Sequence, residues 1–179
     1  RGADIWGLFA AKLANSVSVL TRRVDNKEPH WLAKFEYRKF DYAASISQGI
    51  KEVMVECGVE EQRINVIRSA VDTSTYQVTP DRSWFLSEFG FQSQDTVVAI
   101  VAQLIKRKGH AVLLKAIQPL LAQDKKLKLL VLGQGPLQHE LTELTNTLGI
   151  VEQVQFAGFR DDLPKLLPNL DLVAHPAFS

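Results

Sequence analysis

The sequence has one cysteine, no long apolar run and no excess of charge of either sign, and each absence excludes a class of protein. Cys57 stands alone, so no internal disulfide can form. No apolar stretch reaches the roughly 18 residues that a membrane-spanning helix needs, and no signal-peptide pattern opens the chain. A formal net charge of +1 provides no basic field that would attract nucleic acid. We therefore expect a cytoplasmic protein without a nucleic-acid partner, and leave peripheral contact with the inner face of the membrane open.

Several motifs of catalysis and cofactor binding are also missing. His30, His110 and His139 are far apart in the sequence, and with a single cysteine they provide no metal-ligand spacing. No G-x-S-x-G nucleophile motif follows a strand. Neither a complete G-x-G-x-x-G nor the phosphate-binding pattern G-x-x-x-x-G-K-S/T is present. His175 follows a predicted strand alone, where a histidine is more often structural than catalytic. We expect no bound metal.

What the sequence does contain is a regular alternation of helical and strand-like patterns. Hydrophobic residues make up 46% of the chain and charged residues 23%, as in a soluble globular protein with one or two cores. The runs "VVAIVA" and "LKLLVL" are continuously apolar, which is typical of parallel strands with helices on both faces. This pattern predicts an α/β fold. The predicted strands cover 16–21, 43–47, 63–67, 97–102, 127–132, 153–157 and 171–174, and the clearest helices cover 110–122, 136–148 and 162–167.

Polar and turn-forming residues interrupt this alternation over 72–95, "DTSTYQVTPDRSWFLSEFGFQSQD". One short helical piece is predicted within it, over 81–89. Such a stretch between two regular patterns is typical of a connection between domains. We therefore predict a first domain over 1–75, a linker over 76–95 and a second domain over 96–179. The chain has no initiating Met and stops just after a predicted strand, so we expect it to be part of a longer protein.

Three consecutive cations stand between the strand over 97–102 and the helix that begins at 110. Lys106, Arg107 and Lys108 precede Gly109, which allows a close approach of the backbone. In open parallel sheets, ligands lie beyond the carboxyl ends of the strands, where helix N-termini favour anions. This loop is thus a candidate anion site, although a solvated loop would have the same composition.

A second candidate loop follows the next strand. In "LGQGP", Gly133 and Gly135 bracket a tight turn, and Pro136 suits the first residue of the following helix. Two glycines separated by one residue are weak evidence alone. Two such loops on neighbouring strand ends are stronger evidence than either one.

The segments "VAQLIKRKGHAVLLKAI", "LKLLVLGQGP" and "VQFAGFRDDLPKLLPNLDLVAHPAFS" together resemble the donor-binding domain of glycosyltransferase family 4. That family shows, in order, G-R-L-x-x-x-K-G, G-x-G-P and F-x-G, and then a strand ending in P-S before E-G-x-G-x-x-x-L-E. The resemblance continues backward through "FDYAASISQGIKEVMVECGVEEQRINVIRSAVDTSTYQ". It implies a retaining transferase of the GT-B type, with parts of two Rossmann-like domains. It also implies a nucleotide-sugar donor as substrate, with no cofactor.

The resemblance implies roles for residues of the second domain. Lys108 matches the lysine that pairs with the donor diphosphate, and we expect it to be catalytic. Gln103 stands where an arginine is usual; its amide can bind phosphate without supplying charge, and Lys106 or Arg107 would compensate. Further positions match the turn beside the nucleotide and the segment that flanks the base, namely Gly133, Gly135, Gly158, Phe159 and Arg160.

The first domain offers two arginines at the end of the strand "SVSVLT". Arg23 falls where many family members carry a catalytic histidine near the transferred sugar, and Arg22 precedes it. Guanidinium groups there would recognise a phosphorylated or carboxylated acceptor, such as a glycan or glycolipid of the growing lipopolysaccharide core. The alternative is that both are ordinary surface charges.

Two other functions stay open from the sequence. Gln103 in place of an arginine suggests a nucleotide-sugar-binding or scaffold protein without turnover. The family's pair of glutamates would begin just past Ser179, so the sequence does not decide between an active transferase and a binding protein without turnover. A Rossmann dehydrogenase is disfavoured, because no acidic residue follows a complete glycine fingerprint at a strand end.

Overall fold

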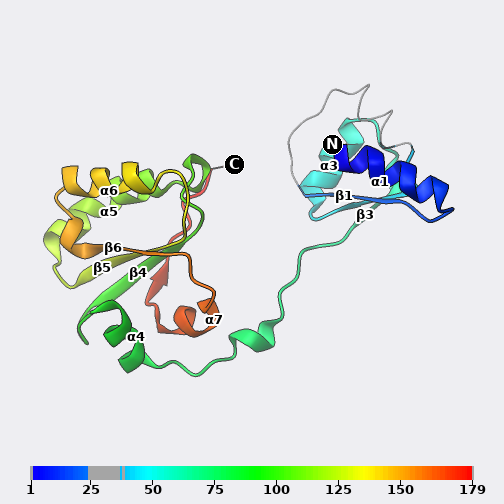
Figure 1. Ribbon diagram of the computed structural model, residues 1–179. Coiled ribbons are helices and arrows are strands. Elements are labelled where there is room, and N and C mark those ends of the chain that lie inside the picture. Colours follow the sequence, from blue (N-terminus) through cyan, green and yellow to red (C-terminus); the bar gives the residue numbers. More distant parts are fainter. Residues whose placement is uncertain (1, 24–36, 38, 179) are drawn as a thin grey trace. The chain divides into compact units, whose positions relative to one another are not determined.

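The computed structural model describes residues 2–23, 37 and 39–178. These residues form two compact units, 1–71 and 72–179, each with a parallel sheet of its own (Figure 1). We call them unit 1 and unit 2. The α/β class predicted from the sequence is confirmed.

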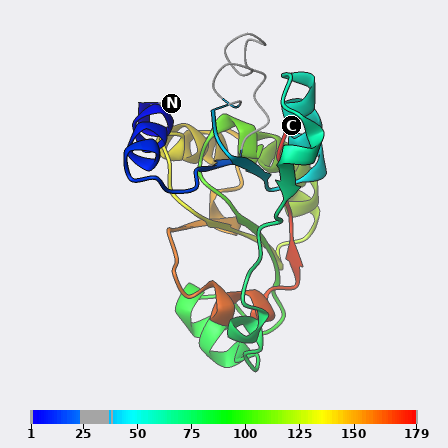
Figure 2. The ribbon, with the colours of Figure 1, turned by 90° about the vertical axis from the view of Figure 1, so that its right-hand side faces the viewer.

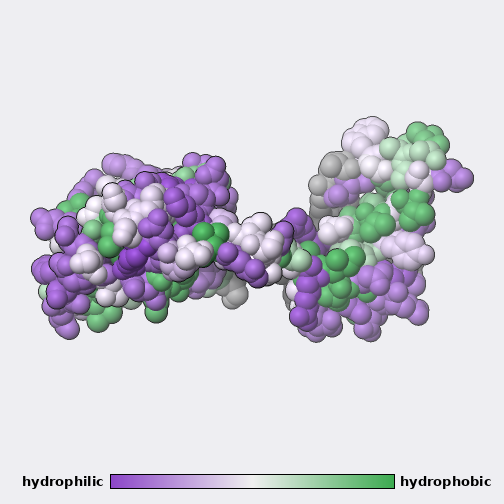
Figure 3. Space-filling view, turned by 90° about the horizontal axis from the view of Figure 1, so that it is seen from below, coloured by the Kyte–Doolittle hydropathy of each residue, from purple (hydrophilic) through white to green (hydrophobic). Residues whose placement is uncertain are grey.

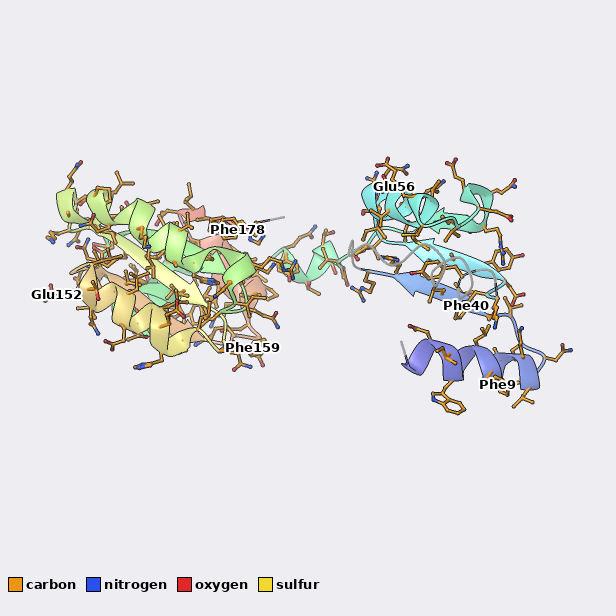
Figure 4. The ribbon with its side chains drawn as sticks, turned by 90° about the horizontal axis from the view of Figure 1, so that it is seen from above. Phe9, Phe40, Glu56, Glu152, Phe159 and Phe178 are labelled. Atoms are coloured by element: carbon orange, nitrogen blue, oxygen red, sulfur yellow. The ribbon has the colours of Figure 1, made fainter. Side chains whose placement is uncertain are left out.

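Unit 1 is a three-stranded sheet in the order β1-β2-β3 with helices on both faces. Helices α1 and α3 lie on opposite sides of this sheet (Figure 4). Its core is formed by residues such as Leu20, Met54 and Ile64. The described elements are α1 (Gly2–Leu13), β1 (Val19–Arg22), β2 (Tyr42–Ser45), α3 (Gln48–Glu56), the 3-10 turn η1 (Glu61–Arg63) and β3 (Ile64–Val66).

Local chemistry sets the boundaries in unit 1. The strand that was predicted to start at residue 16 begins only at Val19. Ser18, just before it, is bound to a side chain instead of a neighbouring strand: its N–H and its Oγ both donate to Oδ2 of Asp41, at 2.8 and 2.7 Å. Ser47 caps α3 as predicted, since its Oγ accepts from the N–H of Ile50. Gly58, at φ 87°, follows the end of this helix, as expected for a left-handed stop.

Helix α1 leaves an apolar stripe uncovered. Leu8 is buried against the sheet, whereas Ile5, Trp6, Phe9 and Leu13 are between 56% and 81% exposed. Phe9 is labelled in Figure 4, and the space-filling view shows hydrophobic surface over unit 1 (Figure 3). Among the described residues, no helix has both the length and the hydropathy that a bilayer crossing requires.

Unit 2 is a four-stranded parallel sheet in the order β6-β5-β4-β7, and the short strand β7 pairs with β4 at one edge (Figures 1 and 2). Its elements are the helix α4 (Arg82–Phe89), β4 (Thr96–Val101), η3 (Lys106–Lys108), α5 (His110–Gln123), β5 (Leu127–Leu132), α6 (Gln138–Thr147), η4 (Val151–Gln153), β6 (Val154–Gly158), α7 (Leu163–Leu166), η5 (Leu167–Asn169) and β7 (Leu172–Val173), preceded by the 3-10 turn η2 (Thr73–Tyr76).

The two faces of this sheet are covered by different pairs of helices. Successive residues of β4 alternate between the faces, so that Val98 and Ile100 join one core and Val97 and Ala99 the other. Helices α5 and α6 cover the first face, and α4 and α7 the second (Figure 1). This is why the strands read as continuous apolar runs.

The segment predicted as a linker over 76–95 is partly folded into unit 2, so the predicted linker is too long. Phe85 and Phe89 of α4 are buried in the second core of the sheet. The guanidinium of Arg82 donates to Oδ2 of Asp171 at 3.0 Å, and that carboxylate also accepts from the N–H of Val97 at 2.7 Å. Helix α4 is thereby joined to both β7 and β4.

We predict that Phe85→Ala lowers the free energy of unfolding of unit 2 by about 3–5 kcal/mol, because a fully buried ring leaves a cavity. Denaturant titration followed by the fluorescence of Trp84 on the same helix measures this. Tyr76→Ala, in the exposed turn η2, is the control and should change the value by less than about 0.5 kcal/mol. A cost below about 1 kcal/mol for Phe85→Ala would show that α4 is not part of this core.

Candidate functional site

Three loops meet at the carboxyl ends of β4, β5 and β6. The loop after β4 is tied to the loop after β5 by two hydrogen bonds, from the N–H of Leu104 to the carbonyl of Gln134 and from the N–H of Leu137 to the carbonyl of Leu104, both 3.1 Å. The N–H of Gly133 donates to the carbonyl of Gly158 at 2.7 Å, which joins the loop after β6. The carboxyl end of the sheet is therefore lined by one continuous hydrogen-bonded backbone.

Gly133 and Gly135 make this contact possible. Gly133 has φ 143°, and a Cβ there would lie 2.0 Å from the carbonyl oxygen of Ala102. A Cβ on Gly135 would lie 2.6 Å from the carbonyl oxygen of Leu104. The sequence predicted a tight turn at these residues; the structure shows that they also let two neighbouring loops touch through their backbones.

A pocket of about 250 Å³ opens between the three loops. Gln103 and Gln134 present exposed amide side chains beside it, and Phe159 is 68% exposed (Figure 4). Among the predicted donor-binding residues, Gln103, Gly133, Phe159 and Arg160 line this pocket. The others, Lys106, Lys108, Gly135 and Gly158, lie in or directly beside the same loops without lining it. The remaining lining residues are Val101, Ala102, Leu132, Gln134 and Leu163, which we had not predicted as site residues.

The three cations lie in the short turn η3, directly before α5. Its backbone is fixed by hydrogen bonds from the N–H of Lys108 to the carbonyl of Ile105 and from that of Phe178 to the carbonyl of Arg107, at 3.0 and 2.9 Å. Lys106 and Arg107 are exposed, and Lys108 is partly buried. Within the described ranges, none of these three side chains has an ion pair, so their charge is available to an anion.

The N-terminus of α5 adds donors to these cations. Gly109 is the N-cap at φ 74° and has no side chain with which to cap the helix. The N–H of Leu113 is the first to bond back, to the carbonyl of Gly109 at 3.0 Å. The N–H groups of the first turn, at 110–112, are therefore free to meet an anion. This position also requires glycine, since a Cβ on residue 109 would lie 2.1 Å from the carbonyl oxygen of Pro176.

Arg160 is held by two carboxylates of its own unit. Its Nε and one terminal nitrogen donate to Asp162 at 2.8 and 2.7 Å, and the other terminal nitrogen donates to Glu88 at 2.7 Å. The guanidinium also lies 5.6 Å from the centre of the Phe89 ring. These hydrogen bonds raise the pKa of Arg160 and lower that of Asp162. Arg160 therefore braces the pocket wall, and its side chain is less available to a ligand than the resemblance implied.

The two arginines of unit 1 differ in exposure. Arg22 ends β1 and is only 5% exposed; its guanidinium donates to the hydroxyl of Tyr37 and lies 5.9 Å from the centre of that ring. Arg23 follows the strand and is exposed. Arg22 is thus buried inside unit 1, and Arg23 is the accessible member of the pair.

A larger hollow, of about 670 Å³, lies at the opposite, amino-terminal end of the same strands. Lys125, Lys126 and Lys128 line it. Helix α5 ends beside it, so the lysines face the negative end of a helix dipole. The side-chain amide of the buried Gln153 is fully engaged, accepting from Lys125 and donating to two carbonyls. The position of these lysines is therefore explained by the helix dipole and by the bond to Gln153. Ligands of open parallel sheets bind at the carboxyl ends of the strands instead.

A metal centre is not found in the part of the chain that the structure describes: it contains no group of three or more histidine, cysteine, aspartate or glutamate side chains placed to hold an ion.

A family model described as "Glycosyl transferases group 1" matches residues 84–179, which is more than half of the chain. Among solved structures, that of Anabaena Alr3699/HepE in complex with UDP and glucose aligns with a TM-score of 0.81 and 22% identity, covering 98% of this chain and 50% of that one. WaaG, a glycosyltransferase involved in lipopolysaccharide biosynthesis, aligns with a TM-score of 0.71 and 16% identity, covering 98% and 57%. These likenesses confirm the predicted GT-B type of fold.

The curated relatives that match are longer than this chain. The 2-deoxystreptamine glucosyltransferase of Streptomyces kanamyceticus is 25% identical over 126 residues, 68% of this chain and 33% of that protein. The D-inositol 3-phosphate glycosyltransferase of Corynebacterium kroppenstedtii is 24% identical, covering 98% of this chain and 43% of that protein. The chain thus spans between a third and a half of the length of these relatives.

We predict that Gly133→Ala destabilises unit 2 by more than about 3 kcal/mol, since it adds a clash with the Ala102 carbonyl to an unfavourable φ. Gly149→Ala is the matched control, because Gly149 also has positive φ, at 67°, but nothing lies within 4 Å of its Cβ position. It should cost about 1–2 kcal/mol. Equal costs in denaturant unfolding would show that the close approach of the two loops contributes nothing.

Proposed function

Because the chain belongs to the family of glycosyl transferases group 1, we propose that it forms part of a glycosyltransferase whose unit 2 binds a nucleotide-sugar donor. The observation that carries the proposal is the convergence of a cationic turn, a free helix N-terminus and a pocket on three interlocked loops at the carboxyl ends of β4–β6. Alr3699/HepE, whose fold is similar, has been solved with UDP and glucose.

The diphosphate of the donor would bind at the turn η3 and the start of α5. Lys108 supplies a positive charge there, and the first-turn N–H groups supply donors that need no side chain. Lys106 and Arg107 flank it and would support the same anion. Gln103, at the end of β4, would donate its amide to a phosphate oxygen without adding charge.

The nucleoside would occupy the pocket between the loops. The exposed ring of Phe159 offers a surface on which a base can stack, and the amides of Gln103 and Gln134 can both donate and accept hydrogen bonds. Arg160 would act indirectly, by fixing the loop after β6 through Glu88 and Asp162. Gly133 and Gly135 would form the turn beside the nucleotide, because without side chains they let this loop lie against the loop after β4.

The transfer step would replace one bond to the anomeric carbon of the sugar by another. The bond from that carbon to the β-phosphate oxygen breaks, the acceptor hydroxyl oxygen bonds to the carbon on the same face, and the hydroxyl proton passes to the departing phosphate. Negative charge develops on the leaving diphosphate, so cations and helix N–H groups that hold it stabilise the transition state. Lys108 is the residue we propose for this role.

We propose an anionic acceptor, a glycan or glycolipid such as a lipopolysaccharide core. Arg23 supports this proposal, because it is an exposed guanidinium at the carboxyl end of β1 and can bind phosphate or carboxylate through two hydrogen bonds. WaaG, which is involved in lipopolysaccharide biosynthesis, has a similar fold. A direct catalytic role of Arg23, a cytoplasmic location and peripheral membrane contact stay predictions.

A non-catalytic nucleotide-sugar-binding protein is the alternative. The uncharged Gln103 in the pocket favours it, because one cation fewer faces the leaving diphosphate. Binding of UDP-glucose or GDP-mannose by the intact protein, without transfer to any acceptor or to water, would support the alternative.

We predict that Lys108→Ala lowers kcat/KM of the intact enzyme by roughly 100-fold, which corresponds to about 3 kcal/mol of lost transition-state stabilisation. Lys115→Ala removes an exposed lysine from α5, the helix that follows this turn, outside the site, and should leave kcat/KM unchanged. Steady-state kinetics with varied donor concentration measure both. Unchanged kinetics in Lys108→Ala would identify the cationic turn as an ordinary solvated loop.

For Arg23→Lys we predict a strong loss of activity with a phosphorylated acceptor and little loss with a neutral one, since lysine keeps the charge but lacks the planar fork. Arg68→Lys, an exposed arginine after β3, is the matched control in unit 1 and should be silent with both acceptors. If Arg23→Lys is also silent with both, Arg23 serves the surface and does not bind the acceptor.

A further inference from the structure

His110, the first residue of α5, is buried without any hydrogen-bond partner. Its exposed fraction is 3%, and neither Nδ1 nor Nε2 has a partner among the described residues. It shares the buried face of α5 with Leu114, Ile117 and Leu121, so it is the residue of that face nearest the carboxyl ends of the strands. A buried polar group without a partner costs about 1–3 kcal/mol, and such a cost calls for an explanation.

The surroundings of His110 favour its neutral form. Burial lowers the pKa of the imidazole, and the nearby charge of Lys108 lowers it further. Charged and titratable groups also stand on the elements packed around α5. The turn η3 carries Lys106 and Arg107, both exposed, and the segment after β7, which touches Gly109 through Pro176, carries the exposed His175. Helix α6, on the same face of the sheet, carries His139, Glu140 and Glu143, all exposed. Within the first two turns of α5, Lys115 is the charged residue. Lys108 is thus the charged group that acts on the neutral imidazole in the free site.

An anion bound at Lys108 would offset the charge of Lys108 and thereby raise the pKa of His110 from its value in the free protein. The donor diphosphate carries two negative charges. Lys108 faces them as the cation nearest to His110 in the chain, and the exposed Lys106 and Arg107 flank it. An imidazolium at the first residue of α5, close to Lys108 and at the positive end of the helix dipole, becomes more favourable when those negative charges are present.

We propose that His110 takes up a proton when the donor diphosphate binds at η3 and the start of α5, so that its imidazolium adds a buried positive charge to the exposed and partly buried cations of the site. This proposal rests on the proposed function, because it requires a diphosphate at Lys108. His110 is a positioning residue: it acts through Lys108 and the helix N-terminus and does not contact the reacting atoms.

Proton uptake on binding fixes the direction of the pH dependence. Because the pKa of His110 is higher in the complex than in the free protein, donor affinity rises as the pH falls from 8 towards 6. Each unit by which binding raises this pKa corresponds to up to a tenfold gain in affinity. UDP-glucose and GDP-mannose suit the measurement, since both phosphates of their diphosphate are esterified and do not titrate in this range.

The direct test is an NMR titration of the 179-residue chain with isotopically labelled histidine, with and without the tighter-binding of these two nucleotide sugars. We expect the pKa of His110 to lie below 6.5 in the free chain and to rise by at least one unit in the complex. His139, exposed on α6, is the internal control and should not change. Binding that leaves the pKa of His110 unchanged overturns the proposal while leaving the proposed function intact.

The second test uses variants and separates the two hypotheses. The affinity of the wild-type chain should rise several-fold between pH 8 and pH 6, whereas His110→Gln, which cannot be protonated, should bind with a flat profile. His139→Gln should keep the wild-type profile. A rise that persists in His110→Gln overturns the role of His110. If neither nucleotide sugar binds, or if binding is insensitive to Lys108→Ala, the proposed donor site itself is wrong and the proton uptake with it.

Discussion

The close approach of the backbones at Gly133 and Ala102 is the constraint on which the carboxyl end of unit 2 depends. A Cβ at Gly133 would lie 2.0 Å from the Ala102 carbonyl oxygen, and the neighbouring hydrogen bonds between Leu104, Gln134 and Leu137 exist only at that distance. Without it the loop after β4 would be separated from the loop after β5. The loop that leads from Gln103, in the pocket wall, to the cationic turn would then lose its contact with the glycine turn.

Charge is arranged around this backbone in two ways. The cations of η3 have no ion pair among the described residues and directly precede free helix N–H groups; Lys106 and Arg107 are exposed and Lys108 is partly buried. Arg160, in contrast, is fixed by Asp162 and Glu88 and stabilises the loop after β6. Each arrangement serves a phosphate ligand in its own way. The unpaired cations can bind the anion, and the paired Arg160 holds a loop that surrounds it.

Much of unit 2 could be predicted from the sequence, because its strands are continuous apolar runs and its helices have clear apolar stripes. Helix α4 could not be assigned to a domain, since its two buried phenylalanines lie in a polar stretch and the ion pair of Arg82 joins it to Asp171, 89 residues later. The pairing of Arg160 with Asp162 and with Glu88, which is 72 residues earlier, was not predicted either. For the same reason, burial of Arg22 and His110 depends on contacts that sequence spacing does not contain.

The central claim is that a nucleotide diphosphate binds at the carboxyl ends of β4–β6. The most direct measurement is a titration of the ¹⁵N-labelled chain with UDP, followed through the backbone amide resonances. We predict that the shifted resonances fall in 102–112, 133–137 and 158–163, which surround η3, the glycine turn and the pocket. Shifts confined to 89–95, 125–128 and 151–155, around the lysine-lined hollow at the amino-terminal end of the sheet, would contradict the account.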